Sequence, residues 1–337
     1  MKIISQAPCR ISLAGGGTDV DPFAFEYGGQ VINLAIDLYH QAVLTPQKNP
    51  SLRLEALGET RLINQIYGFK YHQDPKFDLI YAILNFFKPQ INSGFALTVI
   101  GPKHSPLGLG RSGSAAVAII AAFNAWLNTQ LTPLDIGLLA AQLEIKELGW
   151  PGGKQDSLAA AIGGLNLMHF GPGDQVKVEP IKLDQSNLKA LKDNFFMIYI
   201  GGDHHSGSQQ KTLIAGMAEK NKLQSLMRLK SAVSPAVKAL QSADWPGLGK
   251  ILHQAWEDKK ISNPQVSNPK INKLYDLALA QGAYGGKISG SGGAGNMFFI
   301  ISPEKKPAAI NALINQSAKL VNFNFDFEGV KVAVYDN

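Results

Sequence analysis

The sequence predicts an α+β protein of two domains, on three observations. Its 337 residues are long for one hydrophobic core and suit two. Strand-like segments dominate the first third of the chain, and helices then come in groups instead of alternating strictly with strands. Near residue 190 the pattern changes again, which divides the chain into an N-terminal domain, 1–190, and a C-terminal domain, 191–337.

Hydrophobic periodicity and turn residues predict the elements of the N-terminal domain. Apolar and β-branched runs predict strands at 3–14, 30–38, 40–46, 52–56 and 95–100. Helical periodicity predicts helices at 77–87, 113–128, 133–148 and 154–162. Thr132 and Pro133 supply an N-cap and a first-turn proline for the third of these helices. A hairpin of 164–170 and 176–181 follows.

The C-terminal domain is expected to begin with a strand at 195–200. Long helices are expected at 207–232, 234–258 and 268–281. Two strands, a helix and a last strand complete the pattern. The grouping of these helices between strands again favours an α+β class.

Composition and charge exclude several functional classes. No apolar run reaches the roughly 20 residues of a membrane helix, and the N-terminus carries no leader pattern. Cys9 is the only cysteine, which rules out an intrachain disulfide and predicts a cytoplasmic protein. The net charge of +6 is dispersed, so it gives little support to nucleic-acid binding and suits a small anionic ligand.

The segment 105–116, SPLGLGRSGSAA, carries the strongest functional signal. It runs directly into the apolar helix VAIIAAFNAWL. Glycine lets a backbone approach a ligand closely, and the first N–H groups of a helix have no partner within the helix. Because the positive end of the helix dipole lies behind those groups, the segment predicts a phosphate-binding site.

Other interpretations of this segment fit less well. Gly108, Gly110 and Gly113 match the dinucleotide fingerprint GxGxxG, but GPKHSP separates them from the strand and the following segment is helical. No Gly-Lys pair has the earlier glycine of a P-loop. Ser112 misses the hydrolase pattern GxSxG because residue 114 is serine. The plainer alternative is a helix start that is capped tightly and binds nothing.

Two further glycine clusters favour a phosphorylated ligand held by backbone from several sides. The first, RISLAGGGTD, ends the first strand with three glycines, a hydroxyl and a carboxylate. The second, KISGSGGAG, joins two apolar strands near the other end of the chain. Each cluster alone would be compatible with an ordinary tight turn.

The three clusters, in this order, resemble the three motifs of the GHMP kinases, the family of galactokinase, homoserine, mevalonate and phosphomevalonate kinases. PCRISLAGGGTD resembles the first motif, PLGLGRSGSAA the second and KISGSGGAGNMFF the third. The resemblance covers nearly the whole chain. It implies an N-terminal domain with a left-handed βαβ feature, a ferredoxin-like C-terminal domain, and a cleft between them for ATP and a sugar.

Two longer segments are similar to the heptose-phosphate kinases of the family. They are ELGWPGGKQDSLAAAIGG and AWEDKKISNPQVSNPKINKLYDLALAQGAYGGKISGSGG. The resemblance implies phosphorylation of the anomeric hydroxyl of D-glycero-D-manno-heptose 7-phosphate. An unphosphorylated hexose or deoxyhexose is the alternative acceptor, and a sugar and nucleotide sensor without turnover is the alternative function. Monomer and homodimer both stay open.

The resemblance also implies a role for each matching residue. Asp156 corresponds to the general base, and Arg10 to a basic residue beside the reacting centre. Ser112 and Glu144 correspond to the Mg²⁺ partners. The residues expected to bind the nucleotide are Gly108, Leu109, Gly110, Arg111, Ser112, Gly113 and Ser114. Those expected to bind the sugar are Gly17, Thr18, Asp19, Gly290, Gly292 and Gly293.

Three positions depart from the family pattern or leave a choice. Arg111 replaces the usual serine or threonine, and could clamp a phosphate or fold outward. His204 and His205 stand in a loop where heptose-phosphate kinases tend to carry an arginine, and a metal site there is the weaker interpretation. Lys259 and Lys260 could grip a phosphate or form a solvated helix face.

Overall fold

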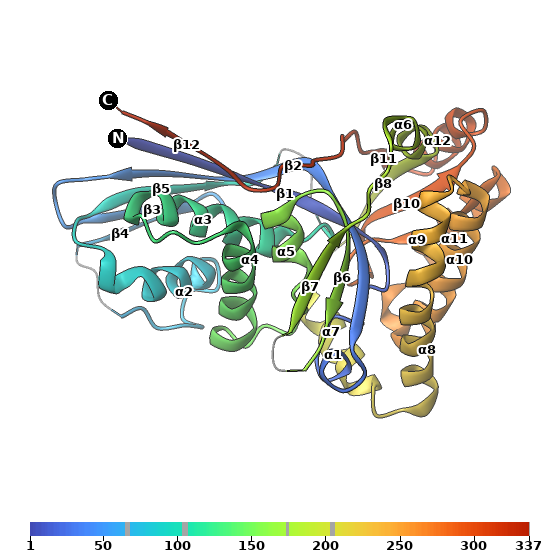
Figure 1. Cartoon of the computed structure of the whole chain (residues 1–337), viewed down its shortest axis with the longest axis horizontal. Coiled ribbons are helices and arrows are strands. Elements are labelled where there is room, and N and C mark those ends of the chain that lie inside the picture. Colours follow the sequence, from blue (N-terminus) through green and yellow to red (C-terminus); the bar gives the residue numbers. More distant parts are fainter. Residues whose placement is uncertain (65–67, 103–106, 173–174, 203–205, 337) are drawn as a thin grey trace.

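A computed structural model describes residues 1–64, 68–102, 107–172, 175–202 and 206–336. Two sheets with helices packed against them confirm the predicted α+β class (Figure 1). The first sheet has eight strands: β1 (Lys2–Ala14), β2 (Gly29–Pro46), β3 (Leu52–Ala56), β4 (Glu59–Ile63), β5 (Phe95–Ile100), β6 (Leu165–Phe170), β7 (Val176–Pro180) and β12 (Lys331–Tyr335). The second has four: β8 (Phe195–Gly201), β9 (Ala283–Ile288), β10 (Gly295–Ile301) and β11 (Lys319–Leu320).

The helices fall into two groups that accompany the two sheets (Figure 1). Those associated with the first sheet are α1 (Phe23–Tyr27), α2 (Asp78–Phe87), the 3₁₀ turn η1 (Lys88–Gln90), α3 (Arg111–Leu127), α4 (Pro133–Gln142), the π-helical turn η2 (Leu143–Glu147) and α5 (Gln155–Ile162). The later ones are α6 (Gln185–Asp193), α7 (Ser206–Gly216), α8 (Lys220–Ser231), α9 (Val233–Gln241), α10 (Trp245–Ser262), the 3₁₀ turn η3 (Pro264–Val266), α11 (Pro269–Ala280) and α12 (Lys306–Ile314).

The first sheet is organised around the long strand β2, which the sequence had divided into 30–38 and 40–46. Its start pairs with β6 and its end with β5, while β1 pairs along the opposite edge. The strand order is β12-β1-β2-β5-β3-β4, with β6 and β7 attached to β2, and among the described strands only β3 and β5 run parallel to each other. The first glycine cluster follows the end of β1. The sheet places that end beside α3 and α5, the helices that come after the second glycine cluster.

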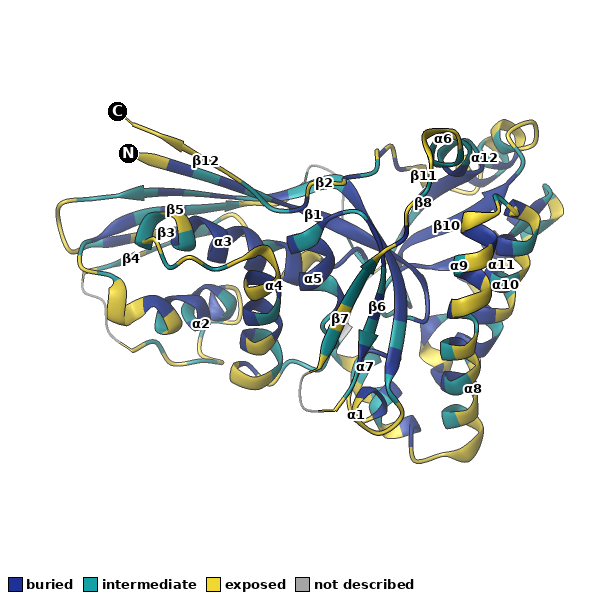
Figure 2. Cartoon of the chain, viewed as in Figure 1, coloured by how far each residue is buried: buried dark blue, intermediate teal, exposed yellow. Residues whose placement is uncertain are grey.

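Buried apolar residues lie on both sides of the centre of the molecule (Figure 2). One cluster fills the space between the first sheet and α2, α3 and α4. A second joins β1 and β2 to α9, α10 and the second sheet. Side chains of both expected domains contribute to that second cluster. The packing therefore holds the two halves of the chain together near the glycine clusters.

Three expected helices are divided in the structure. Helix 207–232 becomes α7 and α8, and Gly216 ends the first of them. Helix 234–258 becomes α9 and α10, because Asp244 caps a new helix start by accepting from the backbone N–H of Gly247 at 2.9 Å. Helix 133–148 is α-helical only to Gln142 and continues as the π turn η2.

The last strand corrects the expected domain boundaries. The sequence assigns all residues after 190 to the C-terminal domain, but β12 pairs antiparallel with β1 and closes one edge of the first sheet. Without that pairing β1 would present an open ladder to solvent, and sheet edges of that kind are prone to unwanted pairing. The division near residue 190 therefore stays a proposal for the rest of the chain, and residues 331–335 belong with the first sheet.

Candidate active site

The second glycine cluster forms the start of α3, where the chain must turn sharply into the helix. Gly110 is the N-cap residue and adopts a left-handed φ of 74°. A Cβ on it would lie 3.3 Å from both the Arg10 and the Asp156 side chains. The first helical bond runs from the N–H of Ser114 to the carbonyl of Gly110. The N–H groups of residues 111–113 thus precede the first bond of the helix and can meet an anion.

Arg10 and Asp156 form a partly buried ion pair directly beside this helix start. Arg10, on β1, is 3% exposed and donates from Nε and Nη2 to Oδ1 of Asp156, at 2.8 and 2.5 Å. Its Nη1 donates to the carbonyl of Gly108 at 2.8 Å. The Asp156 side chain is 31% exposed, and its Oδ2 accepts no hydrogen bond from the described residues. Oδ2 is therefore the oxygen that can receive a proton.

The third glycine cluster packs on the second. A Cβ on Gly108 would lie 2.5 Å from the carbonyl oxygen of Ser289, and one on Gly290 would lie 2.6 Å from that of Gly108. Asn296 adds a hydrogen bond of 2.8 Å to the carbonyl of Leu107. Side chains larger than hydrogen are excluded at both glycines, so the two loops touch through their backbones.

The first cluster places Asp19 beside Gln155, the residue that precedes Asp156. Oδ1 of Asp19 accepts from the N–H of Gly17 at 3.1 Å and from Nε2 of Gln155 at 3.0 Å. Burial, and next the charge of Asp156, raise the pKa of Asp19 above its ordinary value. Gln155 escaped the sequence analysis. Its signal was its position directly before the expected base, in the first turn of α5.

The Ser112 hydroxyl lies close enough to Glu144 to influence its carboxyl group, so the two side chains can hold one cation together. Burial raises the pKa of Glu144 to about 7, although the Ser112 hydroxyl acts in the opposite direction. Among the described residues no cationic side chain pairs with this carboxylate, and a bound cation would supply that counter-charge. In the described part of the chain no three His, Cys, Asp or Glu residues group around a metal position. A site with one carboxylate and one hydroxyl fits Mg²⁺, which completes its shell with phosphate and water.

Some residues that the sequence assigned to ligand binding use their side chains for contacts within the protein. The hydroxyl of Thr18 is fully buried and lies 2.8 Å from the carbonyl oxygens of both Gly15 and Gln30, which share its one proton. The hydroxyl of Ser114 donates to the carbonyl of Ala7 and lies 3.1 Å from Nδ1 of His40. Leu109 is buried in the shared core. These side chains are not available to a ligand, whereas Arg111 and Ser112 are exposed at the helix start.

The glycines expected to bind the sugar from the third cluster do not all lie at the same place. Gly293 donates its N–H to the carbonyl of Val266, and a Cβ on Gly292 would lie 2.6 Å from the Val266 side chain. Both glycines therefore pack against η3, while Gly290 packs against Gly108 of the second glycine cluster. His204 and His205 lie outside the described residues.

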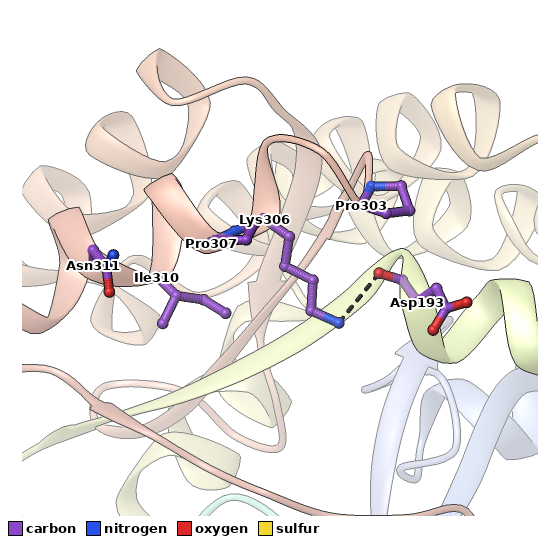
Figure 3. Close-up of a pocket in the computed structure, with 6 residues that line it drawn as sticks. All are labelled: Asp193, Pro303, Lys306, Pro307, Ile310 and Asn311. Atoms are coloured by element: carbon purple, nitrogen blue, oxygen red, sulfur yellow. Dashed lines mark hydrogen bonds between the residues drawn. The ribbon is translucent and has the colours of Figure 1, made fainter.

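A hollow of about 450 Å³ on the second domain does not add to this site (Figure 3). Its one lysine, Lys306, donates to the carbonyls of Lys192 and Asp193 at 3.1 and 3.2 Å. Cations near the C-terminus of a helix stabilise its unpaired carbonyls, and α6 ends at Asp193. Lys306 therefore stabilises the end of α6, and nothing about its position requires a bound ligand.

Comparison with known proteins decides the family. The models of the GHMP kinases N terminal domain and the GHMP kinases C terminal match residues 78–164 and 236–319. The D-glycero-alpha-D-manno-heptose 7-phosphate kinase of Campylobacter jejuni is 32% identical over 337 residues, covering 98% of this chain and 99% of the relative. The chain belongs to the GHMP kinase family. It is accordingly a phosphotransferase with an alcohol group as acceptor, and its family uses ATP.

Solved structures agree with this GHMP kinase fold. A D-glycero-D-manno-heptose 1-phosphate kinase of Bacteroides thetaiotaomicron superposes with a TM-score of 0.82 at 27% identity, over 99% of this chain and 100% of that one. A sugar kinase of Campylobacter jejuni gives 0.77 at 31% identity, with 98% of each chain covered. Lactococcus lactis galactokinase, solved with galactose, gives 0.78 at 15% identity, over 98% and 95% of the two chains, and supports the fold alone.

Proposed function

We propose that this GHMP kinase transfers the γ-phosphoryl group of ATP to the anomeric hydroxyl of D-glycero-D-manno-heptose 7-phosphate. The observation that supports this chemistry is the position of Asp156. Arg10 holds its Oδ1 near the start of α3, and its Oδ2 makes no hydrogen bond to the described residues. Similarity to the Campylobacter jejuni heptose 7-phosphate kinase supports the acceptor.

In this proposal the N–H groups at the start of α3 bind the triphosphate, and Oδ2 of Asp156 accepts the proton of the acceptor hydroxyl. Arg10 keeps Asp156 oriented, and its charge lies close to where negative charge accumulates on the transferred group. Ser112 and Glu144 would hold Mg²⁺, which neutralises charge on the phosphates when bound. Asp19, oriented by Gln155, accepts hydrogen bonds from sugar hydroxyls.

The test measures ADP release with ATP, Mg²⁺ and a panel of sugars. We expect the highest kcat/KM with the heptose 7-phosphate and loss of turnover without Mg²⁺. Asp156→Asn should lower kcat by about 10²–10⁴, because general base catalysis is worth that much, while thermal unfolding checks that it folds.

Two outcomes would contradict the proposal. Faster turnover of mannose or fucose would make the protein a kinase of unphosphorylated sugars. If no sugar is turned over above the Asp156→Asn level, a ligand sensor replaces the kinase, and ATP with Mg²⁺ would then change only the unfolding temperature.

A further inference from the structure

Helix α10 carries two adjacent lysines that the sequence could not distinguish. Lys260 lies on the outer face, with Nζ 2.8 Å from the carboxylate of Glu257 and 5.8 Å from the ring centroid of Trp256. Lys259 is only 9% exposed, and its Nζ donates to the carbonyl of Gly290 in the third glycine cluster. The solvated helix face therefore belongs to Lys260, and Lys259 enters the active site.

A second buried ammonium lies behind Lys259. Lys287, on β9, is 3% exposed, and its Nζ has no hydrogen-bond partner among the described residues. It lies 5.3 Å from the ring centroid of Phe298. Burial, and next the charges of Lys259 and Arg10, hold the pKa of Lys287 well below its ordinary value. The side chains of Arg10, Lys259 and Lys287 thus converge on this side of the site.

The nearby carboxylates do not neutralise these lysines. Asp156 is paired with Arg10, and Asp19 is bonded to Gly17 and Gln155. Within the described ranges, neither Lys259 nor Lys287 makes an ion pair with a carboxylate, although the charge of Asp19 does act on Lys259. An ammonium buried without its anion is costly, and an anion that binds from outside would reduce that cost.

We propose that Lys259 binds the phosphate group that the acceptor sugar already carries, with Lys287 adding positive potential behind it. The inference rests on the proposed function. The ammonium enters from the second domain, and the charges that act on it are those of Arg10 and of Asp19 in the expected sugar turn. The triphosphate has its own donors at the start of α3, so the phosphate of the acceptor is the anion that still needs a cation.

The kinetic test compares Lys259→Met with the matched variant Lys260→Met on two acceptors, the heptose 7-phosphate and the same heptose without phosphate. Lys259→Met should raise KM for the phosphorylated acceptor by about tenfold or more, and so reduce the preference for it by that factor, because a charge-assisted contact is lost. Lys260→Met should match the wild type. An equal loss of kcat on both acceptors would assign Lys259 to the transferred phosphoryl group and overturn the proposal.

Thermal unfolding gives a readout that does not depend on activity. Without ligand, Lys259→Met should unfold at a higher temperature than the wild type, since methionine replaces a buried unpaired charge. Inorganic phosphate should stabilise the wild type and Lys260→Met more than Lys259→Met. Equal stabilisation of all three proteins would overturn the proposal.

The two levels of inference can fail separately. If the wild type does not turn over the heptose 7-phosphate, the proposed acceptor is wrong. If it does, and Lys259→Met leaves KM for that acceptor unchanged, only the role of Lys259 is wrong.

Discussion

Arg10 connects Asp156 with the second glycine cluster through its guanidinium group and its backbone. It holds Oδ1 of Asp156 and the carbonyl of Gly108, and its own N–H donates to the carbonyl of Leu109. A lysine could replace the charge but not the fixed fork of donors. The proposed base, Asp156, and the second glycine cluster therefore keep one geometry relative to each other.

The buried hydroxyl of Thr18 gives a prediction about stability. It serves two carbonyls, and it accepts from the N–H of Gln30 at 3.0 Å. Thr18→Val should lower the free energy of unfolding by about 1–3 kcal/mol, because buried partners lose their bonds. Chemical denaturation measures this loss. A large rise in the sugar KM with unchanged stability would instead make Thr18 a substrate contact.

Lys259 predicts a pH dependence. Burial lowers its pKa to about 8, with Arg10 as the second cause. The ammonium carries its charge below that pH, so kcat/KM for the phosphorylated acceptor should fall as pH rises through about 8, where the phosphate itself no longer titrates. The fall should be absent in Lys259→Met. An identical pH profile for both proteins would assign the titration to another group.

The same pKa fixes the sign of a stability effect. Because the folded-state pKa lies below the unfolded value, burial of the charged form costs stability below about pH 8, and the cost disappears as pH rises toward the unfolded pKa. The stability advantage of Lys259→Met should therefore shrink over that range.

At the level of elements, the start of α3 depends on the backbone of Gly110. Gly110→Ala should destabilise the fold by about 1–2 kcal/mol through left-handed strain and should raise KM for ATP, because Arg10 and Asp156 must also give way. Gly58 is the matched control, with a φ of 78° and nothing within 4 Å of the point that a Cβ would occupy. Gly58→Ala should show the strain without the change in KM. Equal ATP kinetics in both variants would contradict this role.

The π turn η2 is a feature that the sequence did not predict. Periodicity predicted one helix over 133–148, but the N–H of Leu148 reaches the carbonyl of Leu143, five residues back, at 3.0 Å. One extra residue in a turn leaves the apolar pattern nearly unchanged, so no periodicity reveals it. The turn carries Glu144, whose position opposite Ser112 could be expected only from the family resemblance.

Other features were predictable for physical reasons that can be named. The glycine clusters required close backbone contacts, and Gly108 and Gly290 make them. The direction of Lys259 was not predictable, because a helix of mixed polarity offers adjacent lysines two faces and only the packing of α10 on the third cluster decides between them. The hydrogen bonds of the Thr18 and Ser114 hydroxyls could not be predicted either, because their partners are carbonyls distant in the sequence.

At the scale of the whole molecule, the segment after α12 binds the two halves together. The N–H of Asp326 donates to the carbonyl of Ala35, its Oδ2 accepts from Tyr39, and the N–H of Val330 donates to the carbonyl of Ala161. In the part of the chain that the structure describes, no helix is long and apolar enough to span a bilayer.

We therefore expect the two halves to unfold together. A calorimetric scan should give one transition with equal calorimetric and van't Hoff enthalpies, because the shared apolar cluster and β12 couple the sheets. Two resolved transitions would show that the halves are independent. ATP should shift the single transition upward as a whole.

The pairing of β12 with β1 has a consequence for the order of the chain itself. Lys2 stands opposite Tyr335 in the ladder, at the same edge of the sheet (Figure 1). A short linker from 335 to 2, with new ends at the exposed turn around Leu57, would give a circular permutant that keeps every strand pairing. In such a protein the two strands now at opposite ends of the chain become one local hairpin, so the longest loop closure of the fold becomes one of its shortest.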